Sequence, residues 1–221
     1  MSSIDLWYTT RATGLAALVL LSATMVLGLL TAGRTSSPRW PGFARAELHK
    51  RVSAASIVFL AIHVLTSILD SYVHIGWASI VMPFVSSYNR FWTGLGTVGV
   101  DLMAAVAISS ALRRRIPPRL WRSLHWLAYG SWPVAVAHAV GEGTDMRLGP
   151  VDALVAVCVL AVIGAAALRA ARWRMAGAAR PALVAAQLRR THLRLADWRV
   201  APSVRHRDRS VTTTTAARAG D

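Results

Sequence analysis

The sequence predicts an all-α membrane protein, a polytopic bundle of about five transmembrane helices. The chain has 221 residues, of which 54% are apolar and only 16% are charged. The apolar residues gather in five stretches, each close to the length of about 20 residues that crosses a hydrocarbon core. These stretches cover residues 13–32, 52–69, 91–112, 120–140 and 151–169. A chain of this length holds one such bundle and little else.

The first stretch is similar in length and composition to a signal peptide, but its flanks favour a retained helix. Asp5 and a single base, Arg11, precede it, and no clear small-residue cleavage site follows. We therefore count it as the first span.

The residues after the fifth stretch predict a basic cytoplasmic tail, 173–221, attached to a membrane domain, 1–172. The string PALVAAQLRRTHLRLADWRV places leucines, a tryptophan and arginines at roughly helical intervals, which predicts an amphipathic helix on the inner leaflet. Nucleic-acid binding is the competing explanation for this arginine density. The membrane topology already accounts for it, so we expect membrane lipid and no nucleic acid as the partner. From residue 201 onward the composition is typical of disorder.

The distribution of basic residues predicts the orientation of the chain. All but three of the 25 Lys and Arg lie between the first and second stretches, between the third stretch and the first turn of the fourth, or from the end of the fifth onward. The exceptions are Arg11, Arg90 and Arg147. The positive-inside rule then predicts a multi-pass protein of the cell membrane, with its N-terminus outside and its C-terminus in the cytoplasm.

Two pairs of histidines lie within the apolar segments. His49 and His63 are fourteen positions apart at the second stretch, and His125 and His138 are thirteen apart at the fourth. A helix rises about 1.5 Å per residue, so each pair spans roughly 20 Å along its axis. The second and fourth spans run in the same direction across the membrane. We therefore expect His49 level with His125 near the inner surface, and His63 level with His138 near the outer one.

The rotational phase differs between the two spans. Fourteen residues make four turns at 3.5 residues per turn, so His49 and His63 share a face. Thirteen residues do not close in this way, and a regular helix leaves His138 out of phase with His125. Pro133 lies between them and distorts a helix locally. A short tightening toward 3₁₀ winding would turn His138 in the required direction.

Paired imidazoles in a membrane favour haem ligation. Imidazole is a usual axial ligand of haem iron, and ionisable groups within the bilayer are candidates for function. The chain has one cysteine, Cys158, and no CxxCH motif, so any haem would be a non-covalent b-type haem. The main alternative is divalent metal transport, since imidazole also binds zinc and iron(II). No carboxylate stands beside His63 or His138 in the sequence to complete such a cage.

Four arginines lie at the levels where haem carboxylates would be expected. They are Arg11 and Arg90 at the outer edge and Arg51 and Arg122 at the inner edge. A guanidinium fork suits a carboxylate, although ordinary interfacial anchoring is favoured for any one of them.

The segment 71–90 and the start of the third stretch are unusual for a membrane protein's outer end. The segment is too apolar for an ordinary loop and too short to span, so we expect it in the outer interface, as a cap over the outer haem or a docking surface.

Gly94, Gly96 and Gly99, at the start of the third stretch, would let a planar ring or another helix approach closely. Helix packing is the favoured explanation for these glycines.

The residues of about 6–171 resemble the ferric reductase-like transmembrane domain, which is shared with NADPH oxidases. The resemblance lies in the two-by-two histidine spacing on alternate helices. The strings AELHKRVS, AIHVLTSILD, LHWLAYGSWP and HAVGEGTD are similar to a bacterial, mainly actinobacterial, branch. The resemblance implies two b-type haems, with His49 and His125 on the inner iron and His63 and His138 on the outer iron. It also implies electron flow across the membrane.

The chain departs from better-known members of that family in two ways. Those members often have six spans and, in the oxidases and ferric reductases, a flavin and nicotinamide domain after the last one. Here only about fifty residues follow the fifth stretch, without a G-x-G-x-x-G turn. We therefore expect the membrane component of an oxidoreductase system, supplied by a separate flavoprotein or quinol, with an unknown acceptor. A non-redox protein, such as a divalent metal permease or an assembly partner, is the alternative.

Overall fold

The computed structural model describes residues 3–31, 41–70, 75–142 and 149–200, and these are almost entirely helical. The helices are α1 (Ser3–Thr31), α2 (Gly42–Leu69), α3 (Arg90–Ala111), α4 (Pro118–His125), α5 (Leu127–Glu142) and α6 (Gly149–Val200). A short 3₁₀ helix, η1 (Trp77–Ile80), precedes α3. The predicted all-α class is confirmed. The predicted disorder from residue 201 onward lies outside the described residues.

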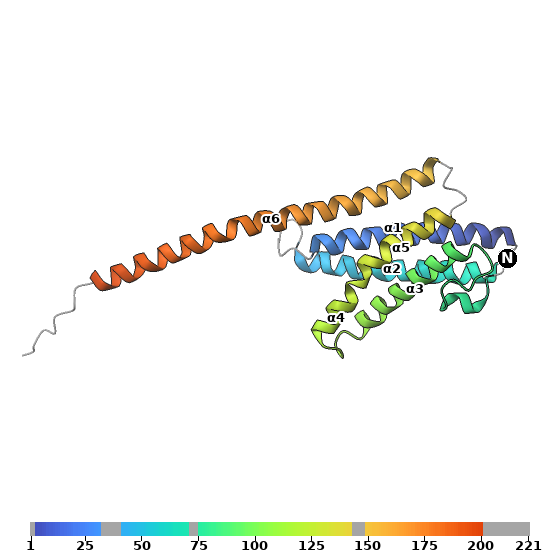
Figure 1. The fold of residues 1–221 in the computed structure, drawn as a ribbon, viewed down its shortest axis with the longest axis horizontal. Coiled ribbons are helices and arrows are strands. Elements are labelled where there is room, and N and C mark those ends of the chain that lie inside the picture. Colours follow the sequence, from blue (N-terminus) through green and yellow to red (C-terminus); the bar gives the residue numbers. More distant parts are fainter. Residues whose placement is uncertain (1–2, 32–40, 71–74, 143–148, 201–221) are drawn as a thin grey trace, which may run out of the picture. The chain divides into compact units, whose positions relative to one another are not determined.

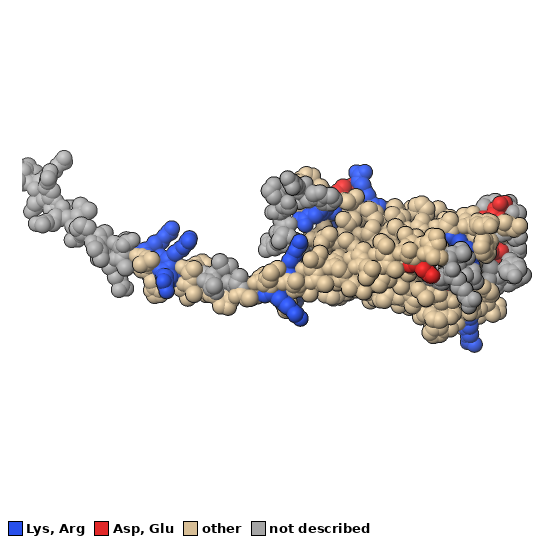
Figure 2. Space-filling view, turned by 90° about the horizontal axis from the view of Figure 1, so that it is seen from above, with Lys and Arg blue, Asp and Glu red and all other residues tan. Residues whose placement is uncertain are grey.

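Four helices are long and apolar enough to cross a membrane. They are Ile4–Thr31, Gly42–Leu69, Arg90–Ala111 and Gly149–Ala178. Large apolar side chains on their outer faces are exposed, among them Val58 at 56% and Leu160 at 68%. In Figure 2 the flank of the helical bundle is almost entirely tan, with the charged side chains mainly toward its ends. Such a surface suits lipid and not water, so the protein is a multi-pass membrane protein.

The fourth predicted span, 120–140, is wrong as a single continuous helix. The chain forms α4 and α5 instead, and the interruption is at Trp126. There the N–H of Trp126 is shared between the carbonyls of Arg122 and Ser123, and the N–H of Tyr129 bonds to the Trp126 carbonyl. Bonds to the residue three positions back are those of a 3₁₀ turn. The 16 residues of α5 rise about 24 Å, so this crossing depends on both helices.

The other predicted spans are confirmed as helices, but most are longer than predicted. Helix α1 begins at Ser3 and α2 at Gly42, each about ten residues before the predicted start. Helix α6 continues past residue 169 to Val200, with Pro181 inside it. Polar and basic residues therefore extend these helices beyond the apolar stretches.

The bundle is built from two helix pairs that also contact each other. Helix α1 packs against α2, and α3 packs against α5, while α1 and α5 also touch (Figure 1). Met25 and Leu29 of α1 form an apolar cluster with Val162 and Ala165 of α6. The indole N–H of Trp132 on α5 donates to the Ser22 hydroxyl of α1 at 2.9 Å. This bond joins the two pairs near the middle of the bundle.

The chain divides into two compact units, Met1–Arg172 and Trp173–Asp221. The first contains the helix pairs and the first part of α6, and the second contains the remainder of α6. That the second unit is a cytoplasmic tail on the inner leaflet stays a prediction.

Candidate functional site

The structure brings the four histidines together in two pairs. The ring centres of His49 and His125 are 6.4 Å apart, and those of His63 and His138 are 6.3 Å apart. The ring planes are inclined by 70° in both pairs. His49 and His63 lie on α2, His125 ends α4, and His138 lies on α5. The 3₁₀ turn at Trp126 lies between His125 and His138, the two histidines that face those of α2.

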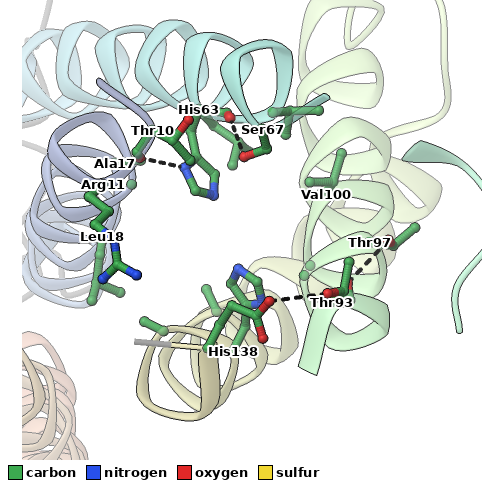
Figure 3. Close-up of a pocket in the computed structure, with 18 of the residues that line it drawn as sticks. Thr10, Arg11, Ala17, Leu18, His63, Ser67, Thr93, Thr97, Val100 and His138 are labelled. Carbon is green, nitrogen blue, oxygen red and sulfur yellow. Dashed lines mark hydrogen bonds between the residues drawn. The ribbon is translucent and has the colours of Figure 1, made fainter. Parts of the chain in front are cut away.

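The separation of each pair fits one metal ion between two imidazoles. A metal–imidazole bond is about 2 Å long, and the ring centre lies roughly 1 Å behind the bonding nitrogen. Two such ligands on opposite sides of an iron therefore have ring centres a little over 6 Å apart. Figure 3 shows His63 and His138 pointing toward each other across a cavity, from α2 and α5. The residues present therefore fit a haem with two axial histidines.

Three of the four imidazoles are oriented by a backbone carbonyl. Nδ1 of His63 lies 2.8 Å from the carbonyl oxygen of Thr10, and Nδ1 of His138 lies 2.8 Å from that of Trp92. Nδ1 of His49 lies 3.2 Å from the Thr24 oxygen. A carbonyl only accepts, so each Nδ1 carries the hydrogen and each Nε2 keeps its lone pair in the neutral ring. Histidines that bind metals are usually held in this tautomer by such a bond.

His125 is held differently. Its Nδ1 is buried and has no hydrogen-bond partner among the residues that the structure describes. Its ring stacks on Trp121, one turn earlier in α4, with ring centres 5.1 Å apart and planes inclined by 24°. The inner pair is therefore asymmetric, whereas both imidazoles of the outer pair have a carbonyl acceptor.

A glycine faces each of the three carbonyl-bound imidazoles. A Cβ atom added at Gly14 would lie 2.9 Å from Nδ1 of His63, and one at Gly96 would lie 2.7 Å from Cε1 of His138. At Gly28 it would lie 3.4 Å from Cε1 of His49. Helical side chains lean toward the N-terminus and cover the preceding turn. A missing side chain therefore uncovers a carbonyl on that turn for the imidazole.

The three arrangements share one spacing. The accepting carbonyl belongs to the residue four positions before the glycine in every case, Thr10 before Gly14, Thr24 before Gly28 and Trp92 before Gly96. Gly14 and Gly28 were not predicted as site residues, although their separation of fourteen equals that of His49 and His63. Helix packing was the favoured explanation for Gly96, but this glycine accommodates the planar ring of His138.

A cavity of about 470 Å³ surrounds the outer pair. This is within the range of about 300–1,000 Å³ for cofactor and ligand pockets. Apolar side chains such as Leu18, Leu21 and Val100 line its depth. Four residues of the segment predicted as a cap also line it, namely Ile75, Ser79, Ile80 and Tyr88. The described part of the segment therefore lies beside this cavity, and its role as a cap or a docking surface stays a prediction.

The cap is fixed to the third helix. The Thr97 hydroxyl of α3 donates to the Ser79 carbonyl of η1 at 2.6 Å. Phe84 has a left-handed backbone with a φ of 64°, and its ring occupies the space that a side chain at Gly94 would take. Gly94 therefore serves the close approach of an aromatic ring from the cap.

Polar groups gather at the rim of the cavity. The Glu142 carboxylate accepts hydrogen bonds from the Asn89 amide at 2.9 Å and the Thr93 hydroxyl at 3.3 Å. Burial raises the pKa of this carboxyl, which lies beyond the apolar stretch 120–140. Arg11 also lines the cavity, and its guanidinium lies 4.4 Å from the ring centre of Trp7.

The other three arginines considered for haem carboxylates are engaged elsewhere. Arg51 forms an exposed ion pair with Glu47 at 2.9 Å. Arg122 donates to the Pro118 carbonyl within its own helix, and Arg90 donates to the Phe84 carbonyl of the cap. All three are exposed. Of the four, only Arg11 lines the cavity of a histidine pair.

A site for a bare divalent cation is not formed by the described part of the chain. No group of three or more His, Cys, Asp or Glu side chains there lies close enough to hold a metal ion. A bare cation bound by protein alone usually takes at least three such ligands. Two isolated imidazole pairs instead suit a metal whose other ligands come from a macrocycle.

The fold and these pairs define a helical membrane protein with two opposed histidine pairs at different depths. A family model described as Ferric reductase like transmembrane component matches residues 13–136. The chain belongs to this family. Its domains generally bind haem and take part in transmembrane electron transfer, typically with a flavin or quinol donor. Neither the curated proteins nor the solved structures gave a match.

Proposed function

We propose that the protein carries electrons across the membrane through two b-type haems. His49 and His125 would hold the inner haem, and His63 and His138 the outer one. The supporting observation is the geometry of the pairs, with ring centres 6.4 and 6.3 Å apart on opposed helices. The family and the three oriented imidazoles support the same assignment.

The chain itself supplies ligands, orientation and a dry environment. Carbonyl oxygens fix the tautomer of three imidazoles, which keeps Nε2 directed between the paired rings. The lining of the cavity around the outer pair is mostly apolar. When bound, a haem would supply one-electron chemistry, which the protein tunes through these ligands and through burial.

The two levels would form a path across most of the bilayer. Fourteen residues of α2 separate the two levels, a rise of about 21 Å along the helix. We place the inner pair toward the cytoplasm, because most basic residues flank that end in the sequence. The electron donor would then be a separate flavoprotein or a quinol, with the acceptor on the other side.

Absorption spectroscopy on histidine variants tests the proposal. The purified protein should bind two haems per chain, and dithionite should sharpen its visible bands as expected for six-coordinate haem. His63→Leu and His138→Leu should each remove about half of the haem, and the double variant should remove no more than either. His49→Leu combined with His63→Leu should remove nearly all of it.

His192→Leu is the matched control, because His192 is exposed on α6. It should leave the haem content unchanged. A colourless protein from haem-sufficient cells would refute the proposal. Binding of zinc or iron(II) by that colourless protein would favour the divalent metal permease instead.

A further inference from the structure

A stack of three side chains leads from the link between α3 and α4 to the inner histidine pair. The ring of Trp121 lies against His125, with centres 5.1 Å apart. The guanidinium carbon of Arg113 lies 5.7 Å from the centre of the Trp121 ring. Trp121 and His125 are half-buried, whereas Arg113 is exposed. The stack therefore connects the protein surface to an imidazole of the inner pair.

Positive charge that no carboxylate of the described residues pairs with surrounds the surface end of this stack. Residues 113–122 read RRRIPPRLWR, with five arginines and no acidic residue. All five arginines are exposed. The ion pairs found in the described ranges instead join Glu47 to Lys50 and Arg51. We call residues 113–122 the arginine link.

The positive-inside rule explains why basic residues lie at this end, but it does not explain their arrangement. Lys50 and Arg51 lie at the same end of the bundle and share the Glu47 carboxylate. Among the described residues no carboxylate pairs with the arginine link, which instead contains an aromatic ring that contacts a histidine. A positive surface around a buried redox path attracts an acidic partner and orients it there.

We propose that the arginine link is the docking surface of an acidic electron-donor protein, and that Trp121 is the contact through which the electron reaches the inner pair. This inference rests on the proposed function. His49 and His125 would hold the inner haem, and that haem would accept one electron from a reduced flavin of the donor. The donor is oxidised by one electron, and no covalent bond of this chain forms or breaks.

The test uses the full chain in nanodiscs of neutral lipid, with flavodoxin, a small acidic flavoprotein, as the probe. Arg114→Gln with Arg115→Gln should weaken flavodoxin binding about tenfold at low salt, because electrostatic attraction of this kind changes association by ten to a thousandfold. Lys50→Gln with Arg51→Gln is the matched control, removing two bases at the same end, and should change binding less than twofold. High salt should abolish the difference between the two double variants.

Stopped-flow reduction separates docking from electron entry. Trp121→Leu should leave flavodoxin binding unchanged but slow haem reduction by reduced flavodoxin about tenfold. Reduction by reduced methyl viologen, a small cation that needs no acidic docking, should be unaffected by the arginine variants.

Equal binding of flavodoxin by both double variants, or binding that ignores salt, would overturn the proposal. So would a loss confined to association with phosphatidylglycerol vesicles, which would make the arginine link a lipid anchor. These outcomes are distinct from failure of the proposed function, because flavodoxin binding is measured whether or not the protein contains haem.

Discussion

Gly96→Ala tests how the outer imidazole pair is held. The added Cβ would lie 2.7 Å from Cε1, 2.8 Å from Nδ1 and 3.1 Å from Nε2 of His138. Ordinary contacts between such atoms are about 3.5–4.0 Å. The imidazole must therefore withdraw from α3 by roughly 0.8 Å, since the Cβ is part of a rigid helix.

The withdrawal has a cost that the structure specifies. The acceptor of Nδ1, the Trp92 carbonyl, also belongs to α3 and lies 2.8 Å away. Moving the ring by that amount stretches the bond to about 3.6 Å, beyond the range of a useful hydrogen bond. Loss of such an orienting bond typically lowers metal affinity about 10–100-fold. We expect Gly96→Ala to retain close to half of the haem, with the remaining haem held by the inner pair.

Haem content after purification, followed by titration with added haem, measures this effect. Gly130→Ala is the matched control on α5, since no atom lies within 4 Å of its added Cβ. Gly28→Ala should have a small effect, because its Cβ would meet His49 at 3.4 Å. Full haem content and unchanged affinity in Gly96→Ala, or an equal loss in Gly130→Ala, would refute the reasoning.

Three other substitutions test contacts around the same site. Gly14→Ala should also remove about half of the haem, because its Cβ would lie 2.9 Å from an imidazole nitrogen of the outer pair; haem content checks this. Thr97→Val removes the 2.6 Å bond to the Ser79 carbonyl, and hydrogen exchange at residues 75–82 should become faster without a change in haem content. Trp132→Phe removes the 2.9 Å bond to Ser22 and should lower the free energy of unfolding by about 1 kcal/mol, as measured by thermal unfolding. An unchanged free energy of unfolding would mean that this bond does not stabilise the fold.

The pairing of the histidines could be predicted because it depends on two simple quantities. Helical rise places His49 level with His125 and His63 level with His138 once the two spans run in the same direction. A repeat of fourteen also keeps His49 and His63 on one face. Neither quantity needs information about packing, and the structure brings the same four residues together.

The fourth predicted span contains a helix irregularity, but its 3₁₀ bonds are not at Pro133. The sequence indicated a local distortion at Pro133, because proline lacks the N–H that an α-helix uses, and 3₁₀ tightening as the change that would turn His138 in the required direction. Pro133 lies within α5, and the 3₁₀ bonds are at Trp126 and Tyr129. A proline marks where a helix lacks one bond, whereas the required rotation can be made at any turn between the two histidines. The sequence does not distinguish these turns.

The supporting groups were the least predictable part of the site. A carbonyl acceptor leaves no trace in the sequence, because every residue has one. Only the glycine that uncovers it can be recognised, and Gly14 and Gly28 are identified by a spacing equal to that of the histidines on α2. The partners of the arginines were hidden for a related reason, because the level of Arg51 and Arg122 does not reveal that their side chains bond to Glu47 and the Pro118 carbonyl.

The missing acceptor of His125 predicts unequal haems. His125 and His138 are thirteen residues apart. The residue of α3 that lies thirteen positions after Gly96 is Ser109, not a glycine, and its hydroxyl donates a hydrogen bond to the Val106 carbonyl. No described residue accepts a hydrogen bond from Nδ1 of His125, whose ring instead stacks on Trp121. An imidazole whose Nδ1 lacks an acceptor is a less basic ligand, and it is held less firmly.

We therefore expect the inner haem to exchange its ligand more readily than the outer haem. After reduction, carbon monoxide should displace His125 from the inner haem that the His138→Leu protein would retain. His49→Leu leaves the outer haem intact, and its imidazoles, both anchored by carbonyls 2.8 Å away, should exchange at least tenfold more slowly. Flash photolysis and stopped-flow mixing with carbon monoxide measure both rates. Equal rates would mean that the carbonyl bonds do not control how firmly these histidines are held.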